Sequence, residues 1–273
     1  MLRRLAPISF AAVVAVTAVT AVVAAVPAGA QDFRWSGSAA AGSEVSVSNV
    51  TGNVTVTAST TGRVEVLGTK RGSGRNYDRI KADVEQTSHG IAICVLYGDN
   101  SSCDDNGSHS NNRGRWNDDD NWGNARMDLE VAIPTNLQVS ASSVSGDVSV
   151  TGAQGDVRAN TVSGDVRLDR LHARSVKANT VSGDLEVRVD EFTGQGDLSF
   201  NTVSGDLTLY VPRNFDADLT MSSVSGDVNS DFSLTVGSTS RMRRGSIEAR
   251  IGNGGRRLDV HTVSGNLRLR AIS

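Results

Sequence analysis

Five aspartates recur at equivalent places in the sequence, and their spacing could support cation chemistry. Each follows a Val-Ser-Gly triplet, at Asp147, Asp165, Asp184, Asp206 and Asp227, and a sixth copy carries Asn266 instead. Carboxylates stacked at the spacing of neighbouring strands, about 4.8 Å, could hold a row of Ca²⁺ ions. They could also be structural, because an Asp side chain bonds backbone N–H groups two residues along the chain in an Asx-turn.

The residue before each aspartate favours the structural interpretation. It is always glycine, which suits a positive φ or a close approach between two stretches of backbone. The glycine-rich Ca²⁺ nonapeptide repeat, with its doubled glycine, is absent. We interpret these segments as structural corners, keep the cation ladder as the alternative, and predict no metal ligand and no cofactor. The corner glycines are Gly146, Gly164, Gly183, Gly205, Gly226 and Gly265.

The spacing of the corners predicts the fold. The valines that precede Ser-Gly are separated by steps of 18, 19, 22 and 21 residues, followed by one of 39 that we interpret as two turns with one degenerate corner. A period of about 20 residues with short strands in each repeat is typical of a solenoid, whose turns stack on their neighbours. We predict an all-β fold, a parallel β-helix or β-solenoid.

Alternation of apolar and polar residues predicts strands on both sides of each corner. Residues 176–180 and 185–189 alternate with period two, and the alternation slips by one across Val-Ser-Gly, as at a bulge. We expect the valines flanking each corner to fill the interior. Asn160, Asn179 and Asn201 should form an amide ladder, and the arginine-bearing strand at 266–270 should protect the end of the stack.

Residues 98–124 interrupt the repeat with a polar insertion that contains six Asp and seven Asn. Such a composition cannot bury a core, so we expect a loop projecting from the solenoid. Loops on rigid scaffolds often carry function. Aspartates could bind Ca²⁺ there and tryptophans could stack on sugar rings, although a solvated loop is the simpler interpretation. The candidate ligand residues are Trp116, Asp118, Asp119, Asp120 and Trp122.

The chain has two cysteines, Cys94 and Cys103, at the start of this insertion. In an exported protein, an even pair favours a disulfide. A metal site would need histidine partners, and only His89 and His109 lie nearby.

Residues 1–30 read as a signal peptide, which places the mature single domain at 31–273. Arg3 and Arg4 precede an apolar run, and Ala28-Gly29-Ala30 forms a small-x-small cleavage site. An uncleaved membrane anchor is the alternative. We therefore expect contact with a membrane only through the signal peptide before cleavage.

No catalytic constellation accompanies the repeated carboxylates. The four histidines are scattered, and neither a nucleophile elbow nor a zinc-protease helix pattern occurs. Identical corners are the opposite of one differentiated active site. With a net charge of −3 and 4% aromatic residues, the chain also has no nucleic-acid-binding signature.

The chain combines an export signal, the Trp35-Ser-Gly37 start, the repeated V-S-G-D-[VL] corners and the cysteine-containing loop. In these features it resembles the bacterial "putative adhesin" family of exported proteins. The resemblance covers residues 35–273 and implies an envelope setting, with no defined binding residues. We predict a secreted, periplasmic or envelope-associated scaffold that is not an enzyme and whose partner is a surface glycan or an envelope protein. A carbohydrate-active β-helix enzyme and a Ca²⁺-stabilised binding module are the alternatives.

Overall fold

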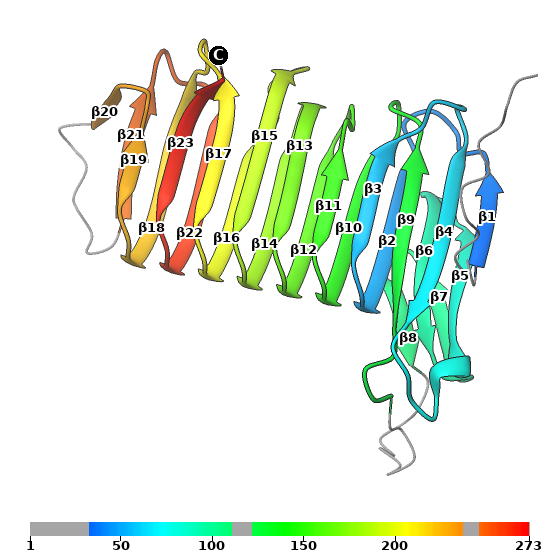
Figure 1. Ribbon diagram of the computed structural model, residues 1–273. Coiled ribbons are helices and arrows are strands. Elements are labelled where there is room, and N and C mark those ends of the chain that lie inside the picture. Colours follow the sequence, from blue (N-terminus) through cyan, green and yellow to red (C-terminus); the bar gives the residue numbers. More distant parts are fainter. Residues whose placement is uncertain (1–32, 111–121, 237–245, 273) are drawn as a thin grey trace, which may run out of the picture.

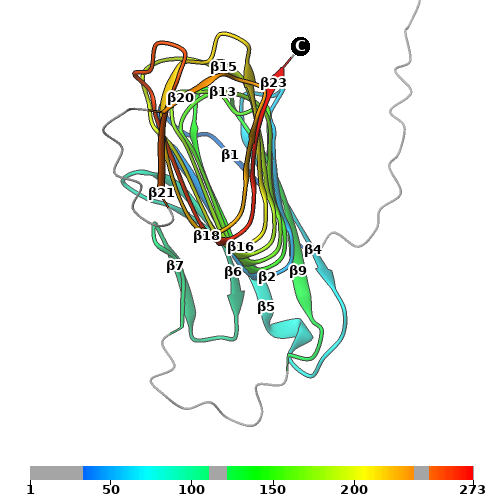
Figure 2. The ribbon, with the colours of Figure 1, turned by 90° about the vertical axis from the view of Figure 1, so that its left-hand side faces the viewer.

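The computed structural model describes residues 33–110, 122–236 and 246–272. Two large sheets face each other along a rod, with their strands side by side across its length (Figure 1). Viewed along the rod, the sheets converge at one narrow edge, which we call the lower edge (Figure 2). The only helix in the described residues is a 3₁₀ turn at Tyr77–Arg79, and none there is long and apolar enough to span a membrane.

The ten-stranded sheet forms one face of the rod. Strands from the middle of the chain pair in parallel, whereas β1 and β4 pair antiparallel at one end. In spatial order its strands are β1 (Phe33–Gly37), β4 (Val64–Arg71), β9 (Arg126–Ile133), β3 (Val54–Ala58), β11 (Val148–Thr151), β13 (Val166–Ala173), β15 (Leu185–Phe192), β17 (Leu207–Pro212), β23 (Leu267–Ile272) and β19 (Val228–Ser230).

The eleven-stranded sheet forms the opposite face. Its central strands are also parallel, and antiparallel strands close both of its ends. In spatial order its strands are β20 (Leu234–Val236), β21 (Ser246–Ile251), β18 (Ala217–Ser225), β22 (Arg257–Ser264), β16 (Leu198–Ser204), β14 (Val176–Ser182), β12 (Val157–Ser163), β10 (Gln138–Ser145), β2 (Glu44–Thr51), β6 (Gly90–Tyr97) and β5 (Ile80–Gln86).

Each regular turn of the solenoid therefore contains two strands. A strand of the eleven-stranded sheet runs down to the lower edge, turns at a Val-Ser-Gly-Asp corner, and continues as a strand of the ten-stranded sheet. The period-two pattern places alternate side chains inside, as with Val157 and Ala159 in β12 and Val166 and Leu168 in β13. One continuous apolar core results. The predicted all-β solenoid is confirmed.

The order of turns in space differs from their order in sequence at both ends of the rod. The first turn, β2–β3, lies between β10–β11 and the strands β6 and β9. The last turn, β22–β23, lies between β16–β17 and β18–β19. The first and the last turn in the sequence are therefore each hydrogen-bonded to a neighbouring turn or strand on both sides. The step of 39 residues between the last two corners is consequently not two successive turns, because the chain runs out through β19, β20 and β21 and then returns inward.

The prediction that the final strand protects an end of the stack is therefore wrong. Strand β23 lies inside the sheet, and its arginines tie it to both neighbours. Arg268 contacts Asp206 at 2.6 Å on one side, and Arg270 contacts Asp231 at 2.8 Å on the other. At this end of the rod, the ten-stranded sheet ends in β19 and the eleven-stranded sheet ends in β20, each of three residues. Short edge strands leave few unpaired backbone groups for another chain to join.

Part of the polar insertion is structured. Residues 101–110 form a hairpin of β7 (Ser101–Asp104) and β8 (Gly107–Ser110), which a simple loop prediction missed. A disulfide joins Cys103 in this hairpin to Cys94 in β6, with a Cα–Cα distance of 5.7 Å. A hydrogen bond between His109 and Asp104 lies within the hairpin, and one between His89 and Asp105 links the hairpin to the turn before β6, each at 2.8 Å. Backbone and histidine hydrogen bonds lower the pKa of Asp104.

Candidate functional site

The corner glycines fill a place where two turns approach closely. Gly146, Gly164, Gly183, Gly205 and Gly226 all have φ between 148° and 156°, a region that disfavours other residues. A Cβ atom on Gly183 would lie less than 3.0 Å from the carbonyl oxygen of Gly164 in the adjacent turn. Both the backbone conformation and the lack of space therefore require glycine.

At four of the six corners, a hydroxyl group three residues before the glycine donates to a backbone carbonyl of the adjacent turn. At the other two corners, the buried hydroxyl groups of Ser223 and Thr262 make no hydrogen bond within the described part of the chain. Thr161 Oγ1 donates to the carbonyl oxygen of Gly146 at 2.9 Å, and Thr180 Oγ1 donates to that of Gly164 at 3.1 Å. These threonines are buried, so their hydroxyl groups need such partners. The threonine of the repeat thus links neighbouring turns from the buried side of the corner.

The corner aspartates form a ladder between turns instead of Asx-turns within one corner. The carboxylates of Asp147, Asp165, Asp184 and Asp206 each accept a hydrogen bond from the backbone N–H of the equivalent residue in the next turn. Asp227 takes part through its own N–H, which donates to Asn266 Oδ1. The prediction of an Asx-turn two residues along is therefore replaced by a longer-range contact. The rungs are Asp147 to Asp165 at 2.9 Å, Asp165 to Asp184 at 2.8 Å, Asp184 to Asp206 at 2.8 Å, Asp206 to Asn266 at 2.8 Å and Asn266 to Asp227 at 3.0 Å.

This ladder explains how stacked carboxylates are tolerated. Four of the five carboxylates, those of Asp147, Asp165, Asp184 and Asp206, face a backbone N–H dipole, and Asp206 also accepts from the guanidinium of Arg268. The N–H of Asn266, followed by Arg268, lowers the pKa of Asp206. Among the residues that the structure describes, no group of three or more His, Cys, Asp or Glu could hold a metal ion.

An amide ladder runs parallel to the aspartates on the outer face of the eleven-stranded sheet. Asn179 Nδ2 donates to Asn160 Oδ1 at 2.6 Å, and Asn201 Nδ2 donates to Asn179 Oδ1. The next turn carries His261 at the same register. The asparagine of the repeat therefore joins turns from the outside.

The valine that precedes Ser-Gly is exposed, which corrects the prediction that both flanking valines fill the interior. The residue after Gly-Asp is buried in the regular corners, as with Val166 and Leu185, but the earlier valine points outward. We call this exposed row the valine ridge. Its members, in spatial order, are Val50, Val144, Val162, Val181, Val203, Val263 and Val224, with exposed fractions between 37% and 82%.

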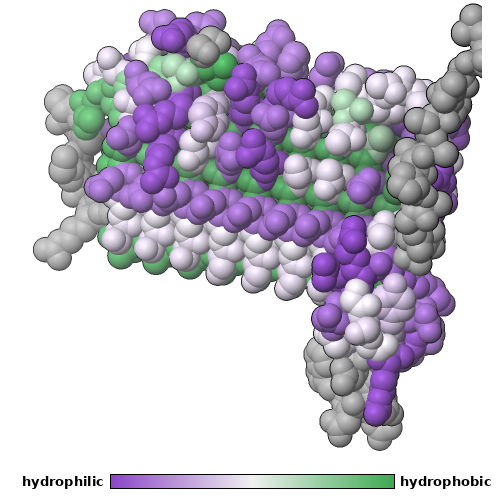
Figure 3. Space-filling model, viewed as in Figure 1, coloured by the Kyte–Doolittle hydropathy of each residue, from purple (hydrophilic) through white to green (hydrophobic). Residues whose placement is uncertain are grey.

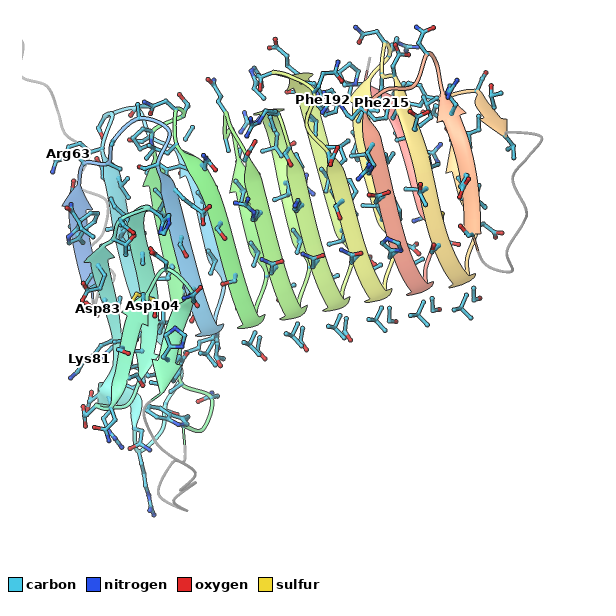
Figure 4. All side chains as sticks on the ribbon, turned by 180° about the vertical axis from the view of Figure 1, so that it is seen from behind. Arg63, Lys81, Asp83, Asp104, Phe192 and Phe215 are labelled. Carbon is cyan, nitrogen blue, oxygen red and sulfur yellow. A yellow bond between two sulfur atoms is a disulfide. The ribbon has the colours of Figure 1, made fainter. Side chains whose placement is uncertain are left out.

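The valine ridge follows the lower edge of the rod. Figure 4 shows a row of side chains projecting below the ends of the strands. Figure 3 shows the same edge as an apolar line, next to a pale row and then a strongly hydrophilic row. A shallow groove of about 520 Å³ lies beside the ridge, bordered by Val203, Val263 and Val224 and by Asn201 and His261. The lower edge thus combines apolar, amide and carboxylate rows.

The candidate ligand residues of the insertion are only partly described. Trp116, Asp118, Asp119 and Asp120 lie outside the described residues. Trp122 packs edge-to-face on Tyr97, with ring centroids 5.3 Å apart, and rests against the apolar core. The structure therefore gives Trp122 a packing role.

The exposed valines were detectable in principle from the spacing of interior residues. Thr161 and Val166 are both buried yet five positions apart, an odd interval that a continuous strand does not allow. At least one intervening side chain must leave the sheet. The polar serine and aspartate of the corner are the obvious side chains to point away from the interior. The polarity of the corner therefore gave no reason to expect that the valine points outward as well.

Comparison with known proteins found similar solved structures and a matching family model. Two crystal structures are similar to the chain: "a putative cell adhesion protein" from Clostridium sporogenes ATCC 15579 and "a putative adhesin" from Bacteroides fragilis NCTC 9343. The first has a TM-score of 0.43 at 9% identity and covers 88% of this chain and 100% of its own. The second has a TM-score of 0.42 at 12% identity and covers 87% and 96%. No curated protein matches.

A family model gives the stronger result. It matches residues 43–194 and 137–270, two overlapping spans that include all of the repeated corners. The resemblance inferred from the V-S-G-D-[VL] repeat is thereby confirmed, and the chain belongs to the Toastrack DUF4097 family.

Proposed function

We propose that the mature chain is a non-catalytic, adhesin-like scaffold of the bacterial envelope that binds an envelope protein along the valine ridge. The observation that carries this proposal is the ridge itself, seven valines exposed in one line. Contiguous exposed apolar surface on a soluble protein commonly marks an interaction site. The signal peptide predicted at residues 1–30 supports an envelope location.

The chemistry of the lower edge supports a protein partner over a glycan. The ridge is aliphatic and contains no aromatic ring on which a sugar could stack. The neighbouring ladder carries carboxylates, which favour cationic side chains on the partner. A partner with an apolar groove bordered by lysine or arginine would contact the valine ridge and the aspartate ladder at once.

The uses of the carboxylates support a role without catalysis. The carboxylates of Asp147, Asp165 and Asp184 all accept the same structural hydrogen bond, whereas acid–base catalysis needs two carboxylates in different states. Two acidic groups at the opposite edge are also engaged. Asp190 pairs with Arg188 at 2.8 Å, and Asp216 accepts from the backbone N–H of Asn253 at 2.9 Å.

Replacing ridge valines should abolish binding without unfolding the rod. In a Val162→Thr/Val181→Thr/Val203→Thr variant, β-branched side chains are retained while three apolar contacts are lost. We expect saturable binding of the labelled mature protein to isolated envelopes of the producing bacterium to weaken about tenfold or more. The melting temperature should change little, because the replaced side chains are exposed.

The matched control is Ser163→Thr/Ser182→Thr/Ser204→Thr, which places threonine at the adjacent corner position and spares the ridge. It should bind as the unaltered protein does. Protease treatment of the envelopes should remove the binding, and periodate oxidation of their glycans should not. Binding that survives the valine replacements, or that only periodate removes, would contradict the proposal.

A further inference from the structure

A second hollow lies at the edge of the rod opposite the valine ridge, where the repeat breaks. Its volume is about 570 Å³. Its walls come from the ends of β15 and β17 and from the turns that follow β15, β17 and β21, at residues 190–195, 212–216 and 254–256. Figure 4 shows Phe192 and Phe215, which line this hollow, at the upper edge. Its polar lining residues are Asp190, Glu191, Gln195, Asn214, Asp216 and Arg256.

The floor of this hollow is rigid before any ligand binds. Arg256 is only 7% exposed, and its guanidinium donates to the carbonyl oxygens of Arg174, Gly194 and Gly196. The same guanidinium lies 4.2 Å from the centre of the Phe192 ring, and Phe192 stacks on Phe215 at 5.4 Å. Because these floor side chains are already fixed, a ligand would pay little entropy for ordering the floor of the hollow.

The rim, in contrast, offers unused hydrogen-bonding groups. Gln195 and Asn214 are exposed, and within the described part of the chain their amides make no hydrogen bond. Each amide has two donors and one acceptor oxygen. The carboxylate of Glu191 is 66% exposed, and its one ion-pair partner among the described residues is His172, at 3.6 Å. The rim therefore offers both donors and acceptors to a ligand.

Charge narrows the class of ligand. Asp190, Glu191 and Asp216 surround the hollow, and Arg256 is the only cation among its lining residues. An anionic group such as a phosphate or a uronate would be repelled. Neutral hydroxyl groups both donate and accept, so vicinal hydroxyls match a rim of amides and carboxylates.

We propose that this hollow binds a neutral saccharide unit, with the amides of Gln195 and Asn214 and the carboxylate of Glu191 holding its hydroxyl groups. The Phe192 ring is already in contact with the guanidinium of Arg256 and stacked on Phe215. The sugar is therefore held by hydrogen bonds at the rim and not by stacking on a ring. This site is separate from the valine ridge and goes beyond the function proposed above.

The test titrates the mature protein with neutral oligosaccharides of glucose, galactose, mannose and N-acetylglucosamine, and with oligoglucuronate, by calorimetry. At least one neutral probe should bind with a dissociation constant of about 10 mM or tighter. Gln195→Ala/Asn214→Ala should weaken it about tenfold or more, since two amide contacts are lost. The exposed-serine control Ser163→Ala/Ser182→Ala should leave it unchanged.

Three results would overturn the saccharide site: no neutral probe binds, the double amide variant binds as well as the unaltered protein, or oligoglucuronate binds more tightly than every neutral probe. The Gln195→Ala/Asn214→Ala variant should keep its binding to envelopes through the ridge. Failure of one proposal therefore leaves the other standing.

Discussion

A Gly183→Ala variant is expected to lose about 3 kcal/mol or more of unfolding free energy. Two costs combine in this single methyl group. The backbone at Gly183 has a φ of 149°, which strains an alanine. The new Cβ would also lie less than 3.0 Å from the carbonyl oxygen of Gly164, so two turns would have to separate. Denaturant unfolding monitored by circular dichroism measures the loss.

Gly62→Ala is the matched control for this prediction. Gly62 also has a positive φ, of 72°, but a Cβ there would have no atom within 4 Å. Its replacement should cost about 1 kcal/mol, from backbone strain alone. Equal losses in the two variants would show that close stacking of the turns is not what requires glycine at the corner.

Breaking the aspartate ladder should have the second largest effect. An Asp147→Ala/Asp165→Ala/Asp184→Ala variant loses three inter-turn hydrogen bonds, each between 2.8 and 2.9 Å long. At about 1 kcal/mol per bond, we expect a loss of about 3 kcal/mol. The corresponding triple asparagine variant keeps an acceptor oxygen at each rung and should remain close to the original stability. Asn53 and Asn266 already occupy rungs of this ladder.

Calcium and pH give further checks on the ladder. Because the aspartates are satisfied by backbone N–H groups, addition of Ca²⁺ should leave the melting temperature unchanged, and a clear increase would favour the cation ladder.

The pKa of Asp206 is lowered in the folded state. Its contribution to stability is therefore present above its unfolded pKa, about 4, and is lost as the pH falls through the folded value. Asp206→Asn should reduce this acid sensitivity.

The repeat in the sequence predicted the solenoid because glycine and the alternation around it are local requirements. Gly183 needs its conformation wherever the turn lies in the stack, and Leu185 and Val187 face inward whatever their neighbours. The corner aspartates were assigned the wrong partner for the same reason. An Asx-turn is a local contact that sequence spacing suggests, whereas the bond from Asp165 to Asp184 depends on how turns stack.

The order of turns at the ends could not be predicted from local pattern. Strands β18 and β22 present nearly the same interior residues, because Leu219 pairs with Leu258 and Met221 with Val260. Either strand could therefore stack on β16 with similar packing. The observed order depends on contacts distant in sequence, such as the hydrogen bonds of Arg256 to the carbonyl oxygens of Gly194 and Gly196.

The hollow lined by Phe192 and Phe215 could not be predicted from the sequence either. Its lining residues come from three turns, at 190–195, 212–216 and 254–256, that share no motif. Asn214 and Gln195 each resemble an ordinary solvated loop residue when considered alone. Only the stacking of turns brings them to one opening.

The division of the corner into inward and outward valines can be measured directly by thiol labelling. The chain has two cysteines, joined in a disulfide, so an introduced cysteine would be the only free thiol. In the folded protein, without reductant, Val162→Cys should react with a thiol reagent nearly as fast as in denaturant, because position 162 is 45% exposed. Val166→Cys should react only after unfolding, because position 166 is 1% exposed. Equal protection of both thiols, or faster labelling at position 166, would contradict the valine ridge.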